Sequence, residues 1–222
     1  MSEDQNNNQN RTLEESDLLK RMRAIASDLW RESPDVAAQP KPKPDKPAKV
    51  VVKRPEIGID NLWMTADETI DWTDALAHEY PGDGLTNPRL WSFYHQQAEP
   101  VLQGDTRAYA EVLKKANPLG ELTAFADGIS MRAPDPDRVE ASFNCRQEYL
   151  EENEKKYLCA MGIRIARDLM ACLPVSEVGV TARKDGKVLM EVTYRREKLL
   201  HRNFTYLDPV KLTEECGANF EP

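Results

Sequence analysis

The sequence has no long apolar segment. No run of apolar residues approaches the roughly 20 residues that a membrane-spanning helix needs. The opening residues, MSEDQNNNQN, are polar and partly acidic, which is unlike a secretory signal. We therefore expect a cytoplasmic protein that makes no use of a membrane.

Cysteine and histidine are also scarce. The four cysteines lie far apart, at Cys145, Cys159, Cys172 and Cys216, and the three histidines are His78, His95 and His201. No two of these residues have the spacing of a metal site, so we expect reduced, packed thiols and no metal. The sequence also lacks a phosphate loop, a dinucleotide motif and a nucleophile–base pair. These absences predict no cofactor and no catalytic residue, and they favour a non-enzymatic function.

The charge is uneven along the chain. Residues 1–60 hold 11 basic and 11 acidic side chains, so the net charge of −8 belongs to residues 61–222. An acidic body repels phosphate at long range, which disfavours nucleic acid as a partner.

Residues 1–56 are expected to form a disordered arm that contains one amphipathic helix, over residues 12–32. Thr12 and Glu15 have the spacing of a capping box at the start of this helix. Its candidate partner-binding residues follow helical spacing, with one aromatic beside them: Leu18, Met22, Ile25, Leu29 and Trp30. The helix could dock in the groove of a partner, fold back on its own domain, or pair with a second copy. Residues 33–56 are rich in proline and lysine and are expected to be an extended linker.

Residues 57–120 are predicted to be a helical preface. One helix is expected from near Asp67 or Thr69 to Tyr80. A second begins at Asn87-Pro88 and is interrupted or kinked near Pro100. Asp105 is a candidate N-cap of a third helix.

Residues 121–222 alternate in the order β-β-α-β-β-α. We therefore predict an α+β fold with a mainly antiparallel, four-stranded sheet and a long helix across one face. In the second hairpin, residues 178–194, a three-residue loop at Lys184-Asp185-Gly186 would place Val180 opposite Met190 and gather the apolar side chains on one face.

Two carboxylates could carry chemistry on these strands, Glu140 and Glu191. A nuclease of the Glu-x-Lys type would need lysine two residues after Glu191, where Thr193 stands. For Glu191, a cross-strand ion pair is the simpler interpretation. A basic cluster follows the second hairpin and is a candidate anion site: Arg195, Arg196, Lys198, His201 and Arg202.

The segment from about residue 96 to the C-terminus resembles an uncharacterised domain found in Gram-positive bacteria. The residues that carry the resemblance are RAYAEVLKKANPLGEL, IRIARDLMACLPVSEVGVTA and VLMEVTYRREKLLHRNFTYLDP. The last motif contains the Asn203-Phe204 and Asp208-Pro209 step into a final helix. The resemblance implies a fold unit and no particular chemistry.

These patterns favour a protein-interaction or scaffold module of a bacterial protein, whose N-terminal helix docks a protein partner or a second copy. Two alternatives stay open. One is a nuclease or another enzyme on a phosphorylated substrate. The other is weak, sequence-independent nucleic-acid binding through the cluster at residues 195–202.

Overall fold

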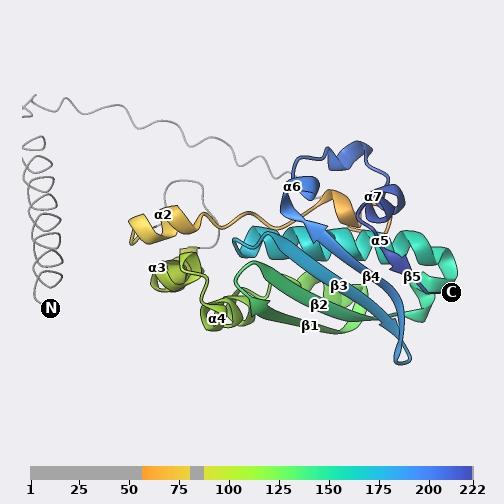
Figure 1. The fold of residues 1–222 in the computed structure, drawn as a ribbon, viewed down its shortest axis with the longest axis horizontal. Helices are drawn as coiled ribbons and strands as arrows, with labels where there is room; N and C mark the ends of the chain where they lie inside the picture. The colour runs from red at the N-terminus through yellow and green to blue at the C-terminus, as the bar shows by residue number, and fades with distance from the viewer. Residues whose placement is uncertain (1–56, 81–87, 222) are drawn as a thin grey trace, which may run out of the picture. The chain divides into compact units, whose positions relative to one another are not determined.

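The computed structural model describes residues 57–80 and 88–221. The arm helix predicted at 12–32 and the linker predicted at 33–56 lie outside the described residues. Among the described residues, five strands form one sheet: β1 (Ala126–Asp135), β2 (Arg138–Cys145), β3 (Glu177–Lys184), β4 (Lys187–Arg195) and β5 (Asn219–Phe220). Their order in the sheet follows the sequence (Figure 1). The predicted α+β class is confirmed.

The helices fall into two groups along the chain. Before the sheet come η1 (Leu62–Met64), α2 (Trp72–Ala77), α3 (Pro88–Leu102), α4 (Thr106–Ala116) and η2 (Gly120–Ala124). Between and after the strands come α5 (Gln147–Cys172), α6 (Arg196–Leu199), η3 (Phe204–Tyr206) and α7 (Pro209–Glu215). All of these elements belong to one compact unit. Within the part of the chain that the structure describes, no helix has both the length and the apolar character to cross a bilayer.

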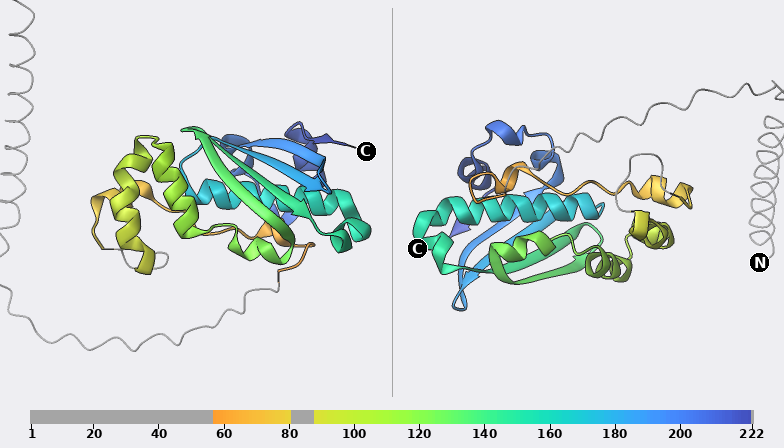
Figure 2. Two further views of the ribbon diagram at one scale, coloured as in Figure 1. Left: turned by 90° about the horizontal axis from the view of Figure 1, so that it is seen from below. Right: turned by 180° about the vertical axis from the view of Figure 1, so that it is seen from behind.

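The sheet is mixed because α5 connects two parallel strands. β2 and β3 pair in parallel, while β1–β2, β3–β4 and β4–β5 are antiparallel. A parallel pair needs a crossover connection, and α5 supplies it. The helix covers one face of the sheet, behind the strands in Figure 1 and in front of them in the right-hand view of Figure 2. The opposite face, which we call the open face, has no helix over it in Figure 1.

The long helix α5 is kinked near its start. Asn153 leaves helical geometry, with φ −161° and ψ 84°. Its side chain accepts a hydrogen bond of 3.1 Å from the Lys156 amide and so caps the longer second part. From Tyr157 onward nearly every residue of the helix is buried. The core therefore lies between this second part and the sheet.

The turn of the second hairpin differs from the prediction. Lys184 pairs with Lys187, so the loop has two residues rather than three. Asp185 and Gly186 both have positive φ, 49° and 81°. This is the combination that a tight, right-twisted hairpin turn requires.

A bulge in the hairpin restores a single apolar face. The register shifts just before the turn, so that Ala182 lies opposite Met190 and Val180 lies opposite Val192. All four side chains are buried. The hairpin therefore has the single apolar face that was predicted, but Val180 does not lie opposite Met190, because the extra residue is in a β-bulge rather than in the loop.

The sheet also has one strand more than predicted. β5 contains two residues and pairs with Met190 and Glu191 of β4. Two residues cannot show an alternating pattern, so this edge strand has no signal in the sequence.

Two helices of the segment before the sheet differ from the prediction: α2 is shorter than expected, and α3 is not interrupted at Pro100. α2 covers only Trp72–Ala77, with Asp71 as its N-cap. α3 runs through Pro100 to Leu102, because a proline near the end of a helix removes only one backbone hydrogen bond. Asp105 caps α4 as predicted, with a bond of 2.8 Å from the Arg107 amide.

Candidate functional site

An extended segment, which we call the strap (residues 65–71), links η1 to α2 and runs along α5 (Figure 2). The Asp67 amide donates to Oδ1 of Asp168 at 2.8 Å. The Ile70 amide donates to the Ala171 carbonyl at 2.9 Å. The strap therefore depends on side chains and backbone of α5 for its position.

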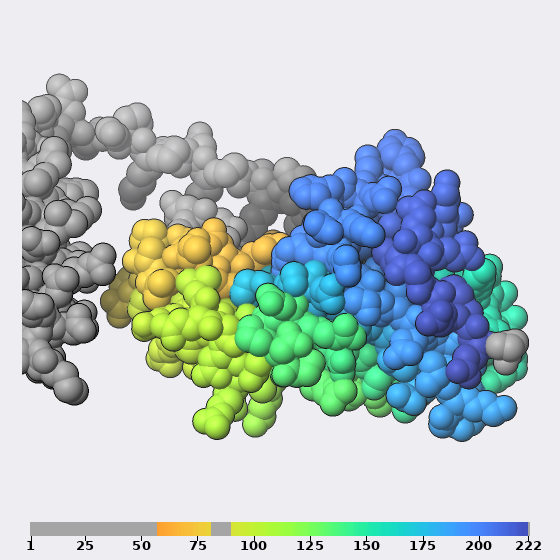
Figure 3. Space-filling view, viewed as in Figure 1, coloured from red at the N-terminus to blue at the C-terminus, as the bar shows by residue number. Residues whose placement is uncertain are grey.

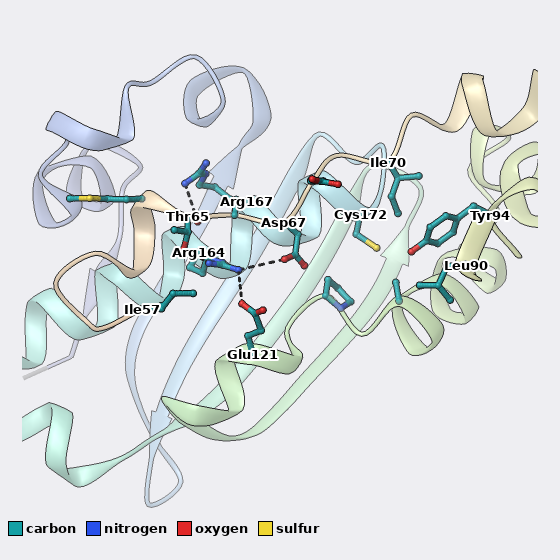
Figure 4. A pocket seen from close by; sticks show the side chains of 15 residues that line it. Ile57, Thr65, Asp67, Ile70, Leu90, Tyr94, Glu121, Arg164, Arg167 and Cys172 are labelled. Atoms are coloured by element: carbon teal, nitrogen blue, oxygen red, sulfur yellow. Dashed lines mark hydrogen bonds and ion pairs between the residues drawn. The ribbon is translucent and has the colours of Figure 1, made fainter. Parts of the chain in front are cut away.

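Arg164 lies at the centre of this region and is almost fully buried. Its Nε donates to Oδ2 of Asp168 at 2.6 Å, and one terminal nitrogen donates to the Thr65 hydroxyl. The other terminal nitrogen, Nη2, lies 3.6 Å from a carboxylate oxygen of Asp67 and 3.6 Å from one of Glu121 (Figure 4). The side chains of Arg164 and Asp168 expose 3% and 0% of their surface. A buried ion pair of this kind fixes the positions of both side chains, because separating them would leave an unpaired charge in the interior at a high cost in free energy.

The carboxyl group of Asp168 feels two opposing effects. Burial raises its pKa to about 7, while the Arg164 guanidinium and the Asp67 amide favour the charged form. Burial is the larger effect. Protonation of Asp168, and with it loss of the ion pair, therefore begins at a higher pH than for an exposed aspartate.

Arg167, about one turn further along α5, contacts both the strap and η3. Its Nη1 donates to the carbonyl oxygens of Trp63, at 2.5 Å, and Thr65, at 3.1 Å. Its guanidinium carbon lies 3.6 Å from the ring centroid of Phe204 in η3, a cation–π contact. Burial lowers the pKa of Arg167 to about 10. Its Nε has no hydrogen-bond partner among the described residues.

A cavity of about 750 Å³, which we call the α5 cleft, opens between the strap, α3, α4, η2 and α5. Its volume is within the range of small-ligand and peptide side-chain pockets. One end contains Arg164, Asp67 and Glu121, with Ile57 beside them; the other end is apolar and contains Ile70 and Leu90 (Figure 4).

Tyr94 and Cys172 also line the apolar end. Burial raises the pKa of both groups to about 12, so they are neutral at physiological pH. The lining of the cleft has one more acid than base, because it contains Asp67, Glu68 and Glu121 against Arg164 and Arg167. The cleft is thus suited to a cationic group that is attached to an apolar one.

The sequence-predicted partner-binding residues cannot be compared with this site. They lie outside the described residues: Leu18, Met22, Ile25, Leu29 and Trp30. Whether they bind a partner stays a prediction.

The structure divides the predicted anion-binding cluster. Arg196 donates to the carbonyl oxygens of Met170, Leu173 and Val175 at 2.6, 2.7 and 2.7 Å. It therefore satisfies backbone acceptors at and just beyond the C-terminal end of α5. Burial lowers its pKa.

The other four members of the cluster face different surroundings. Arg195 pairs with Glu177 at 3.1 Å, and Arg202 pairs with Glu215 at 3.3 Å. Arg195 lines two hollows, one together with Lys198 and the other together with Arg196 and His201. Arg202 lines neither of these, so the five residues do not form a single site, and anion binding by them stays a prediction.

Glu140 and Glu191 both lie on the open face of the sheet. Glu140 accepts hydrogen bonds from Arg132 at 2.8 Å and from Arg138 at 3.2 Å. Glu191 lies in register with Thr181. In residues 57–80 and 88–221, no three Asp, Glu, His or Cys residues are grouped so that they could hold a metal ion. The cross-strand ion pair predicted for Glu191 is not found among the described residues; Glu140 makes one instead, with Arg132 of β1.

Comparisons of the chain with models of protein families, with curated proteins and with solved structures found no match. The resemblance of residues 96–222 to an uncharacterised Gram-positive domain therefore stays an expectation.

Sequence reasoning did not find the centre of the α5 cleft. Arg164 and Asp168 stand four residues apart in the most apolar stretch of the chain. That spacing places both on one side of a helix, where opposite charges pair. Two charges inside an apolar helical segment were the available signal.

Proposed function

We propose that this chain is a non-enzymatic interaction module, and that the α5 cleft receives a basic side chain flanked by apolar residues from a protein partner. The observation that carries the proposal is the asymmetry of the cleft, which joins an acidic end to an apolar end.

The position of the two carboxylates supports a cationic occupant. Asp67 and Glu121 both lie 3.6 Å from the Nη2 atom of Arg164. The Glu121 side chain is 61% exposed, so an ammonium or guanidinium group that enters the cleft would form a shorter, charge-assisted bond with it. The positive charge of Arg164 does not oppose this, because Asp168 lies 2.6 Å from it on the other side.

The helix predicted at residues 12–32 would supply a second contact to the same partner or to a second copy. A short anchor in a cleft and a helix on a tether bind more tightly together than either does alone. The proposal does not depend on this helix, and the two contacts are separable by mutation. Replacing Ile25 by Asp tests the helix and leaves the cleft unchanged.

Site-specific photo-crosslinking tests the proposal. A photoreactive amino acid is placed in the full chain at Met64, which lines the cleft and is 38% exposed. The matched control position is Tyr206, which is 87% exposed and does not line the cleft. After irradiation in lysate of the producing cells, we expect a discrete adduct from position 64 and none from position 206.

The mass of the adduct identifies the class of occupant. An adduct of twice 25.3 kDa would identify a second copy of this chain. A different mass would identify a heterologous partner, whose crosslinked peptide should contain lysine or arginine next to apolar residues. Equal, diffuse labelling from both positions would contradict the proposal.

The enzyme alternative has no comparable support. Glu140 is neutralised by Arg132 and Arg138. On β3, Glu140 lies opposite Gly179 and Glu191 lies opposite Thr181, so the two glutamates are two positions apart along the sheet. Among the described residues, no contact brings these carboxylates to one reacting atom.

A further inference from the structure

The open face of the sheet carries two adjoining hollows that the interaction proposal does not use. Their volumes are about 440 Å³ and 430 Å³. Arg138, Thr193 and Cys216 line both, so the hollows form one continuous trough. Figure 3 looks onto this face, where side chains of the strands themselves make the surface.

A row of alternating charges crosses the strands along this trough. Arg132 and Arg138 flank Glu140, with nitrogen–oxygen distances of 2.5 and 3.2 Å. Arg138 and Arg195 flank Glu177 in the same way, at 3.6 and 3.1 Å. Each glutamate in the row is therefore shared by two arginines, and the row as a whole carries one surplus positive charge.

Two further cations extend this surplus. Arg183 lines the first hollow and Lys198 lines the second. In the part of the chain that the structure describes, neither makes an ion pair. Glu191, in the first hollow, is the acid that offsets one of them. The trough is thus locally basic on a protein whose net charge is −8.

The floor of the trough is made of small and hydroxyl-bearing residues. Gly179 lies under Arg138: a Cβ atom there would come within 2.9 Å of the arginine Nη2. Thr181 lies two residues further along the same strand, and Thr193 lies opposite Gly179 on β4. No aromatic side chain lines either hollow. Stacking on a nucleobase, on which proteins that bind single strands rely, is therefore not available from the lining residues.

We propose that the trough binds a phosphorylated sugar or polyol, with the phosphate at Arg195 and Lys198 and the hydroxyl groups at Thr181 and Glu191. Arginine and lysine match the charge and geometry of a phosphate. A carboxylate and threonine hydroxyls accept and donate the hydrogen bonds that sugar hydroxyls need. The trough lies on the sheet face opposite α5, so this site is independent of the cleft.

Protection of Cys216 gives a direct test on the unmodified protein. This thiol is partly exposed and lines both hollows, whereas the other three cysteines are buried. The probes are glucose 6-phosphate, glucose and inorganic phosphate, each titrated during alkylation by iodoacetamide, with mass spectrometry of the labelled peptide. We expect glucose 6-phosphate to slow the alkylation of Cys216 in a saturable way, at lower concentration than phosphate, and glucose to have no effect.

A matched pair of lysine variants tests the same site by calorimetry. Lys198→Ala removes a cation from the trough, and Lys211→Ala removes an exposed cation from α7 that does not line it. Both residues are exposed, so both variants should fold like the wild type. We expect Lys198→Ala to weaken the binding of glucose 6-phosphate about tenfold and Lys211→Ala to leave it unchanged.

Three outcomes would overturn the assignment. The first is no protection of Cys216 by glucose 6-phosphate at millimolar concentration. The second is equal loss of affinity in the two lysine variants. The third is tighter binding of a single-stranded oligonucleotide than of glucose 6-phosphate, with the same dependence on Lys198.

Discussion

Arg164 and Asp168 form a 2.6 Å ion pair, one helical turn apart and out of contact with water, on the side of α5 that carries the strap. The pair holds the strap against α5, and in the proposed function it also borders the site of recognition. It positions the strap through the Asp67 amide and the Thr65 hydroxyl, and it presents Nη2 of Arg164 to the α5 cleft. The stability of the fold around α5 should therefore depend on both members of the pair.

Removing one member of the pair should be severe. Arg164→Leu leaves the Asp168 carboxylate buried without its partner, which should lower the free energy of unfolding by about 3–5 kcal/mol at pH 8. The double variant with Asp168→Leu should recover part of that loss, because it buries no unpaired charge. Urea denaturation measures both. Arg132→Ala, which breaks an exposed ion pair on β1, is the control and should have little effect.

Stability should fall at alkaline pH. Burial raises the pKa of the Cys172 thiol to about 12 and that of Cys159 to about 11, both from an ordinary value of 9.0. The folded state therefore keeps protons that the unfolded state releases above about pH 9. The resulting stabilisation is complete below pH 9 and is lost as pH rises toward 11–12. Urea denaturation between pH 7 and 10.5 measures it, and Cys172→Ala should show a shallower decline than the wild type. Parallel declines would argue against the buried thiol as a cause.

The four thiols should differ in reactivity. Cys145, Cys159 and Cys172 are buried, and Cys216 is half-buried at the end of α7. With a coloured disulfide reagent at pH 8, one thiol should react in the folded protein and the other three only after unfolding. Cys216→Ser should abolish the early phase. Early reaction of two or more thiols in the native protein would contradict the burial of Cys145, Cys159 and Cys172.

Comparing alanine substitutions of Gly186 and Gly58 measures how much the positive φ of the hairpin turn contributes to stability. Gly186 has φ +81°, and a Cβ atom added there would meet no other atom within 4 Å, so Gly186→Ala changes only the backbone preference. We expect a loss of about 1 kcal/mol in the free energy of unfolding. Gly58 has the same free space without a positive φ, so Gly58→Ala should cost less. Thermal denaturation distinguishes the two, and equal losses would rule out the two-residue turn.

The fold class followed from the sequence because its signals are local and repeated. Alternating apolar residues marked both hairpins, Asp105 marked the start of α4, and Asp208 with Pro209 marked the start of α7. Details that depend on pairing between distant segments did not follow. The bulge near Ala182 and the parallel pairing of β2 with β3 are settled by packing across the sheet, not by either strand alone.

The candidate sites were less predictable than the fold, for a physical reason. Thr65 and Arg164 stand 99 residues apart and Asp67 and Asp168 stand 101 apart, so no local pattern reveals their contact. The basic cluster at 195–202 was visible as a run of charge. Its members are nevertheless separated by the end of β4 and the turn of α6, which direct Arg196 inward and leave Arg195 and Lys198 on the trough.

The central claim is that the acidic end of the α5 cleft recognises a cationic group of a partner. The most direct measurement compares crosslinking from position 64 in two charge-reversal variants of the full chain. Glu121→Lys reverses a carboxylate of the cleft, and Glu111→Lys reverses an exposed carboxylate of α4 that does not line it. We predict that Glu121→Lys abolishes the discrete adduct and Glu111→Lys preserves it. An adduct of undiminished yield in Glu121→Lys would contradict the claim.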